Sequence, residues 1–231
     1  MDVNLVRRRL RSFIRAHRTA FDHLALRRYQ LLEVVGLALA VNHYSSKGYD
    51  VQPTALQSGA FRINTNSRGK PWNFSRWIVS RNGIEFEIYA NLPVGGAYRS
   101  DGAVYVVDVA VVPTGFVPTV RPQTKWTHVD NRHLVTFAES KALVVYPMLI
   151  AQFIGICHEL MPRHLGGVPR RRFIQGNHFK PALISLGYLH AVSLGIVAAF
   201  PGRQYTIGVV SNSDARLLGR KLLPGEPSAF D

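Results

Sequence analysis

Cysteine is nearly absent from this sequence, and no apolar run is both long and uninterrupted. Cys157 is the single cysteine among 231 residues, which excludes disulfides within the chain and zinc sites built from several cysteines. It lies in an apolar segment, and we expect it to be a small core residue. The longest apolar runs contain Glu33, Pro147 or Gln152 and fall short of the roughly 18 residues that a membrane span needs. We therefore expect a soluble, cytoplasmic protein with no membrane partner.

Acidic residues are scarce relative to basic ones. The chain has 28 Lys and Arg but only 14 Asp and Glu, which gives a formal net charge of +14 at pH 7. Such an excess attracts polyanions through counterion release, and it favours nucleic acid or an anionic membrane surface as the partner. Charge alone does not separate these partners from a ribosome-associated or merely basic protein.

Several common catalytic motifs are also missing. The sequence has no Gly-x-Ser-x-Gly elbow, no P-loop and no dinucleotide-binding Gly-x-Gly-x-x-Gly after a strand. The segment "HELMPRH" begins like a zinc protease, but Pro162 stands where the second histidine ligand is needed. These absences argue against the corresponding hydrolases, nucleotide-binding enzymes and metalloproteases.

The apolar pattern predicts a basic helical arm over residues 1–28, a main domain over 29–213 and a tail over 214–231. Within the main domain the expected order is helix, three strands, helix and strand, at about 29–44, 83–94, 103–113, 133–147, 147–160 and beyond 182. Residues 57–80 are expected to form a polar loop. This order predicts a mixed α/β domain with helices on a central sheet.

Two charges interrupt the apolar strand "HLVTFAESKALVVYP". On a strand, Glu139 and Lys141 point to the same side, about 6.6 Å apart along the chain, together with Phe137 and Leu143. The other side carries only small residues, which would let a helix pack closely: Ala138, Ser140 and Ala142. The charges either form a half-exposed ion pair on an edge strand or serve catalysis.

A further acid lies on the preceding strand, where Asp108 is the one polar residue in "VYVVDVAVV". An ionised carboxylate on a buried strand is costly unless it is paired or binds a metal. If the two strands are neighbours, Asp108 and Glu139 can meet and bind Mg²⁺ or Mn²⁺ through oxygen ligands. Lys141 would then position or deprotonate a water that attacks a phosphate.

"VVDVAVV" followed by "TFAESKAL" resembles the core of the PD-(D/E)xK nuclease superfamily, which includes many type II restriction enzymes and Holliday-junction resolvases. The resemblance covers roughly residues 29–160. It implies a restriction-endonuclease-like core, in which a central mixed β-sheet is flanked by helices, with the basic helical extension added at the N-terminus. It also implies that Asp108 and Glu139 bind the metal, that the Ser140 carbonyl is an extra ligand, and that Lys141 assists the water.

The resemblance extends to further positions. Many members carry an acid on the preceding helix, a place that Glu33 fits, although Glu33 could equally be a charge on the helix's exposed flank. Gln152, on the helix after the motif, matches a position where some members have a polar active-site residue. Val107 replaces the usual proline before the first acid, and the loop between the two motif strands is long. Asp101 is a rival for the first acid, although an aspartate in a turn is usually a turn former.

Basic residues outside the motif are the predicted contacts to nucleic acid, with a solvated surface as the alternative. They are Arg7, Arg11, Arg15, Arg121, Lys125, Arg170, Arg171 and Arg172. Trp72 and Trp77 either stack on bases or serve as core residues or loop anchors.

Taken together, the resemblance implies a Mg²⁺-dependent endonuclease acting on DNA. The alternatives are a catalytically inactive nucleic-acid-binding subunit with this fold and a basic scaffold component of a larger nucleoprotein assembly. Because cutting both strands of a duplex commonly takes two sites, a homodimer or partner subunits are expected.

Overall fold

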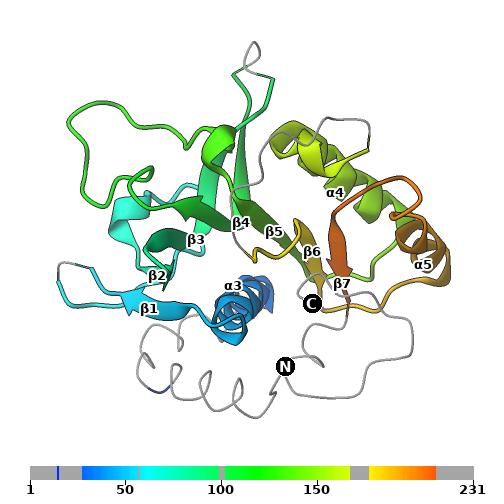
Figure 1. Ribbon diagram of the computed structural model, residues 1–231, viewed down its shortest axis with the longest axis horizontal. Coiled ribbons are helices and arrows are strands. Elements are labelled where there is room, and N and C mark those ends of the chain that lie inside the picture. Colours follow the sequence, from blue (N-terminus) through cyan, green and yellow to red (C-terminus); the bar gives the residue numbers. More distant parts are fainter. Residues whose placement is uncertain (1–14, 16–27, 57, 99–101, 167–176, 212–231) are drawn as a thin grey trace.

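The centre of the molecule is a seven-stranded β-sheet (Figure 1). The computed structural model describes residues 15, 28–56, 58–98, 102–166 and 177–211. In chain order the strands are β1 (Asp50–Thr54), β2 (Arg76–Arg81), β3 (Ile84–Gly95), β4 (Val104–Pro113), β5 (Thr136–Lys141), β6 (Ala182–Ser185) and β7 (Gly208–Val210). They lie in the sheet in that same order. The pairs from β1 to β5 are antiparallel, whereas β5, β6 and β7 run parallel.

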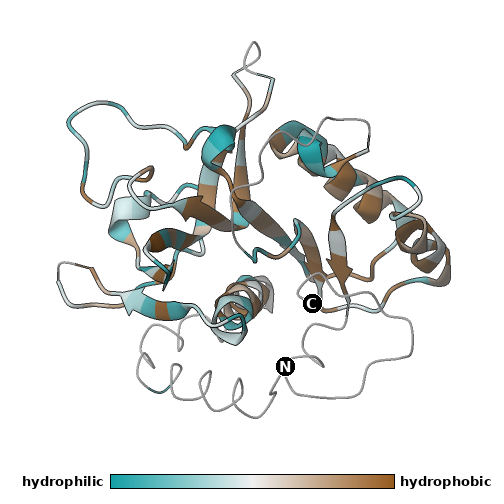
Figure 2. Cartoon of the chain, viewed as in Figure 1, coloured by the Kyte–Doolittle hydropathy of each residue, from teal (hydrophilic) through white to brown (hydrophobic). Residues whose placement is uncertain are grey.

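Helices cover both faces of the sheet. Helix α3 (Arg28–Ser46) packs on one face, and α4 (Pro147–Leu160) with α5 (Ala191–Ala198) packs on the other (Figure 1). The described connections contain three short 3-10 helices: η1 (Pro71–Asn73), η3 (Asn131–His133) and η4 (Pro162–His164). Apolar residues of the strands and helices meet in one core on each face (Figure 2). The predicted α/β architecture with a mixed sheet flanked by helices is therefore confirmed.

Helix α3 lies unusually close to the sheet at one point. A Cβ atom on Gly36 would be 2.8 Å from Ser140 Oγ and 3.3 Å from Ile184 Cδ1, so any larger side chain would push the helix away. Ala138 belongs to the same core as α3, as the run of small residues on this side of β5 predicted. This close contact fixes the height of α3 above β5.

The structure corrects two boundaries drawn from the sequence. Strand β5 ends at Lys141, and Leu143 is 52% exposed, so Leu143 does not share a buried face with Glu139. The chain leaves the sheet here, where the Leu143 carbonyl accepts a hydrogen bond from Ser185 Oγ. Strand β2 begins inside the segment predicted to be a loop, and its Trp77 is only 4% exposed. Trp77 is thus a core residue and does not stack on bases.

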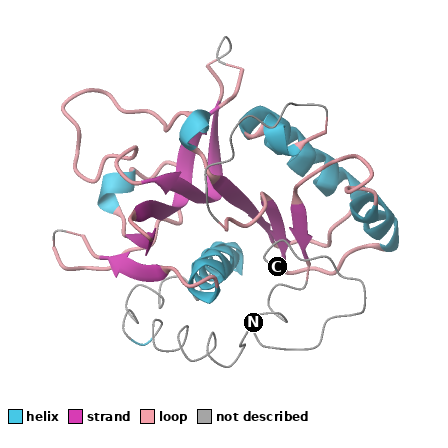
Figure 3. Cartoon of the chain, in the orientation of Figure 1, coloured by secondary structure: helices cyan, strands magenta, loops and turns pink. Residues whose placement is uncertain are grey.

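The remaining segments agree with the prediction or lie outside the described residues. The connection between β4 and β5 is long and almost entirely loop (Figure 3). Of the predicted N-terminal arm, Arg15 is described, and it is helical and exposed. The tail over 214–231 lies outside the described residues. Within the described ranges, no helix combines the length and the apolar character needed to cross a bilayer.

Candidate active site

Strands β4 and β5 separate at the two predicted acids. Their ladder pairs Val111 with Thr136, Ala110 with Phe137 and Val109 with Ala138, and it stops there. In the same register the next pair would be Asp108 and Glu139. Here the Ser140 backbone N–H donates to the Asp108 carboxylate and not to a strand carbonyl, with 2.6 Å between N and Oδ2. The structure therefore brings the two acids side by side at a fork between the strands.

The fork coincides with a change in which side of the sheet the strand residues face. The register places Asn91 of β3 between the pairs Ala90–Val109 and Leu92–Val107, and so opposite Asp108. The even-numbered side chains Phe86, Ile88 and Ala90 of β3 pack in the core under α3, whereas Leu92 and Val94, also even-numbered, pack in the core under α4. Asn91 itself has a positive φ of 50°. Because regular alternation breaks here, polar side chains from both strands occupy a place that two core residues would otherwise fill.

Glu139 and Lys141 form an ion pair within the sheet. Lys141 Nζ lies 3.1 Å from Glu139 Oε2, and the side chains are 39% and 6% exposed respectively. Strand β5 is flanked by β4 and β6, so the alternative of an ion pair on an edge strand is wrong. Burial of the carboxylate on a central strand leaves Lys141 as the cation that partly offsets its charge.

Glu33 reaches the same place from α3. It is half-buried, and its Oε2 accepts a hydrogen bond of 2.8 Å from Asn91 Nδ2. The alternative of a charge on the exposed flank of the helix does not describe this position. Gly36 lies one turn further along α3 and permits the approach of the helix to Ser140, which holds Glu33 over the fork.

The cluster holds more negative than positive charge. Burial, with a contribution from the Asp108 charge, raises the pKa of Glu33 to about 7 against the opposing effects of Asn91 and Lys141. Burial and the Asp108 charge likewise raise the pKa of Glu139 to about 7. Burial also raises the pKa of Asp108. Burial alone would lower the pKa of Lys141, but the three acids together raise it. Three carboxyl groups thus compete for one ammonium group.

The donor atoms suit a hard divalent cation. Carboxylate and carbonyl oxygens are the ligands that Mg²⁺ and Mn²⁺ prefer, and Mg²⁺ usually keeps several waters and takes only one or two carboxylates. Within the described ranges, no three His, Cys, Asp or Glu side chains are grouped closely enough to hold one metal ion. The predicted ligand set needs only Asp108 and Glu139 from that group, with the Ser140 carbonyl and waters completing it. Its chemistry and its excess negative charge fit such an ion.

Other predicted residues lie away from the fork or outside the described part. Gln152 is exposed on α4, and within the described residues it makes no hydrogen bond to the acids. Arg121 and Lys125 are exposed on the loop between β4 and β5. The positions outside the described residues are Arg7, Arg11, Asp101, Arg170, Arg171 and Arg172. Cys157 is buried in the core, as predicted.

Sequence reasoning missed Asn91. It is 5% exposed, donates to Glu33 and lies across the ladder from Asp108. The signal that revealed Asp108 was present here too, because Asn91 is a polar residue in the apolar segment "IYANLPV". A polar residue inside each of three consecutive strands pointed to one location.

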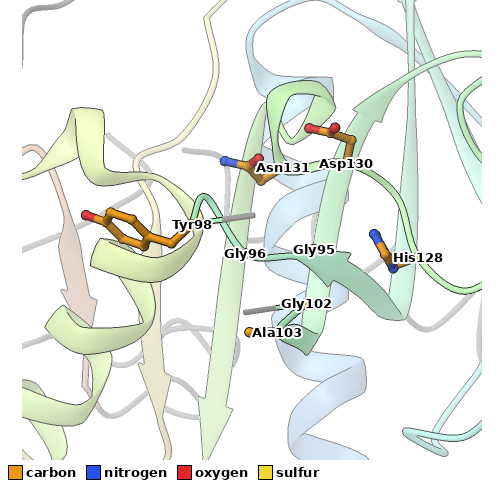
Figure 4. A pocket seen from close by; sticks show the side chains of 8 residues that line it. All are labelled: Gly95, Gly96, Tyr98, Gly102, Ala103, His128, Asp130 and Asn131. Atoms are coloured by element: carbon orange, nitrogen blue, oxygen red, sulfur yellow. The ribbon is translucent and has the colours of Figure 1, made fainter. Parts of the chain in front are cut away.

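A separate cavity of about 270 Å³ opens where β3 ends and β4 begins (Figure 4). Its lining includes Gly95, Gly96, His128 and Asp130, and none of the acids at the fork. The Asp130 carboxylate is already bound by Arg132 through two hydrogen bonds, of 3.1 and 3.0 Å. The cavity therefore adds no group to the site between β4 and β5.

Comparison with known proteins identifies no relative: no family model, no curated protein and no solved structure matches this chain.

Proposed function

We propose that this chain is a divalent-metal-dependent nuclease of the PD-(D/E)xK type that hydrolyses phosphodiester bonds in DNA. One observation carries the proposal: Asp108 and Glu139 meet where β4 and β5 part, with Lys141 3.1 Å from Glu139 and with Glu33 above them. The order α3, β1 to β5, α4 and β6 contains the expected helix, antiparallel strands, helix and parallel strand, and it supports a restriction-endonuclease-like core around that site.

Each residue of the cluster has a role in this reaction. Asp108, Glu139 and the Ser140 carbonyl would hold the ion, with Glu33 as a further acid. The bound ion supplies charge stabilisation to the phosphate under attack. Lys141 would orient the water whose oxygen attacks phosphorus as the bond to the leaving sugar oxygen breaks. The Asn91 amide keeps the Glu33 carboxylate turned toward the fork.

The partner follows from charge and from the exposed basic residues. We propose DNA as the polyanion, bound in part through Arg121 and Lys125, and the cytoplasm as the compartment. Cleavage of both strands would use a homodimer or partner subunits, which light scattering of the chain with and without DNA would detect.

A second candidate is a catalytically inactive nucleic-acid-binding subunit. One observation favours it, since Asp108 Oδ2 and Glu139 Oε2 each already have an internal hydrogen-bond donor. Such internal bonds would satisfy the acids without an ion.

Cleavage of supercoiled plasmid with Mg²⁺ or Mn²⁺ tests the two candidates. We expect wild type to cut, and Lys141→Ala to lose roughly 10²- to 10⁴-fold in rate while its DNA affinity is retained, because the proposed role of Lys141 is to orient the attacking water and not to bind the duplex. Binding without cleavage by wild type, on plasmid and single-stranded DNA and with either ion, would contradict the nuclease and support the inactive subunit.

A further inference from the structure

We propose that residues 62–70, which are part of the connection between β1 and β2, form a phosphate-binding loop that is held at a fixed place beside the acids. The inference rests on the proposed function, because it concerns the substrate of that site. Residues 51–84 contain five basic residues and no Asp or Glu: Arg62, Arg68, Lys70, Arg76 and Arg81. Within this stretch, Asn64 is hydrogen-bonded to Asn91, which lies across the ladder from Asp108.

Two of these five cations have internal partners and three do not. Arg76 pairs with Glu87, and Arg81 donates to the Lys47 carbonyl and lies over the Tyr49 ring. By contrast, Arg62, Arg68 and Lys70 are exposed, and within the described residues their side chains make no hydrogen bond or ion pair. Three cations are therefore left for an external anion.

A pair of buried amides ties this loop to the active site. Asn64 Nδ2 donates to the Asn91 carbonyl at 3.1 Å, and Asn91 Nδ2 donates to the Asn64 carbonyl at 3.0 Å. The two residues are 3% and 5% exposed, so loss of either hydrogen bond would leave a buried polar group unsatisfied. Asn91 Nδ2 is also the donor to Glu33 Oε2. A single amide thus joins the loop to an acid of the site.

The loop is also closed on itself. Asn64 Oδ1 accepts the Asn66 N–H, and Asn66 Oδ1 accepts the Arg68 N–H. The Gly69 N–H donates to the Asn66 carbonyl, and a Cβ atom on Gly69 would collide with Asn64 Oδ1. Arg68 and Lys70 therefore flank the point where the loop folds onto its anchor.

This placement indicates a contact to the backbone of the substrate. Phosphate contacts fix the register of a nucleic acid on a protein, and they do so best from a rigid support. With one phosphate at Asp108 and Glu139, neighbouring phosphates of the same strand would reach Arg68 and Lys70. If the cations served only to balance the acids, their removal would leave DNA affinity unchanged.

Anisotropy titrations of a 20-base-pair duplex over a range of salt concentrations, in EDTA, test the loop with the full chain. We expect Arg68→Gln with Lys70→Gln to weaken binding at least tenfold and to reduce the slope of log K against log salt by about 1.8, or 0.9 for each lost phosphate contact. Arg203→Gln controls for the loss of one remote positive charge, since Arg203 is exposed in the turn before β7, at the opposite edge of the sheet. Equal losses of DNA affinity in the double variant and the control, or no loss in either, would contradict the phosphate-binding role of the loop.

A double-mutant cycle tests whether the hydrogen-bonded pair of Asn64 and Asn91 holds the loop in place. In an Asn64→Ala background the two cations remain but lose their fixed place, so we expect their removal to cost less affinity than it does in wild type. Fully additive losses of affinity, in variants whose circular dichroism shows a folded domain, would contradict this role of the amide pair. Wild type that binds DNA through the loop but cuts no DNA would support this inference while removing the nuclease assignment. Wild type that cuts DNA, with an affinity that the loop substitutions leave unchanged, would support the nuclease assignment and remove this inference.

Discussion

Two clusters of buried charge lie in the same sheet, and they are built in opposite ways. In the first, the Glu87 carboxylate on β3 is 1% exposed, and each of its oxygens has a donor: Arg76 Nε at 2.6 Å and the Tyr89 hydroxyl at 3.0 Å. One guanidinium group and one hydroxyl thus neutralise and satisfy one acid. Burial, together with the Glu87 charge, raises the pKa of Tyr89, which keeps that hydroxyl a donor.

The second cluster, at the fork, is not neutralised in this way. Glu33, Asp108 and Glu139 share the single ammonium group of Lys141, and burial raises the pKa of all three acids. A sheet that balances a buried carboxylate so completely at Glu87 leaves an excess of negative charge a few residues away. The difference separates a balanced ion pair at Glu87 from the place where we propose that a cation binds.

The largest expected effect separates the clusters by activity. Glu139→Gln removes a proposed metal ligand with little change in shape, so we expect cleavage to fall by about 10²- to 10⁴-fold. Glu87→Gln, measured per folded molecule, keeps its cleavage rate because Glu87 has no part in the reaction. Single-turnover assays with Mg²⁺ on both variants make the comparison. A Glu139→Gln protein that cuts like wild type would remove the distinction.

Substitutions in the two clusters should change the stability of the metal-free protein in opposite directions at pH 8. Glu139 has an ordinary pKa of 4.5 and a folded pKa of about 7, so in that window the folded state binds more protons than the unfolded state. The free energy of unfolding therefore falls as pH rises from about 4.5 to about 7, by roughly 1–3 kcal/mol, and changes little above it. Glu139→Gln should reduce this fall and be more stable than wild type at pH 8.

Glu87→Gln should instead lose about 3–5 kcal/mol at pH 8, because it leaves the Arg76 charge without its partner. Urea titrations in EDTA at pH 5 and pH 8 measure both variants. A wild-type protein whose stability rises over this range would contradict the assigned shift.

The smallest expected effect concerns the support of the fork. Gly36→Ala places a methyl group 2.8 Å from Ser140 Oγ, and we expect a loss of about 1–3 kcal/mol together with reduced cleavage as Glu33 is displaced. Gly155→Ala on α4 meets nothing within 4 Å and should gain about 0.5–1 kcal/mol from helix propensity, with unchanged cleavage. Thermal melts and plasmid assays on the two variants test the contrast, which equal shifts of the same sign would disprove.

Part of this site was accessible from the sequence because its residues violate the local pattern. Asp108, Glu139 and Lys141 are polar within apolar strands, and burial makes such residues costly without a function or a partner. Their meeting required only that β4 and β5 be neighbours, which short connections favour. The same reasoning could have found Asn91, but it was applied only to charged residues.

The rest depended on long-range contacts that local patterns do not encode. Strand β2 was missed because "RWIVSR" is short and follows a polar loop, so burial of Trp77 and Val79 shows only once β3 pairs with it. The exposed side chain of Gln152 depends on how α4 packs, which the sequence does not fix. The link from Asn64 through Asn91 to Glu33 joins three distant segments and has no local signature.

The bond from the Ser140 N–H to Asp108 has a consequence for how this fold could change over time. Two substitutions, of Asp108 and Glu139 by valine, would remove the side-chain acceptor and allow β4 and β5 to add another rung of main-chain pairing. The resulting protein would gain apolar burial on β4 and β5, but Lys141 would lose its partner Glu139. The length of the β4–β5 ladder is therefore linked to the presence of an acid at position 108.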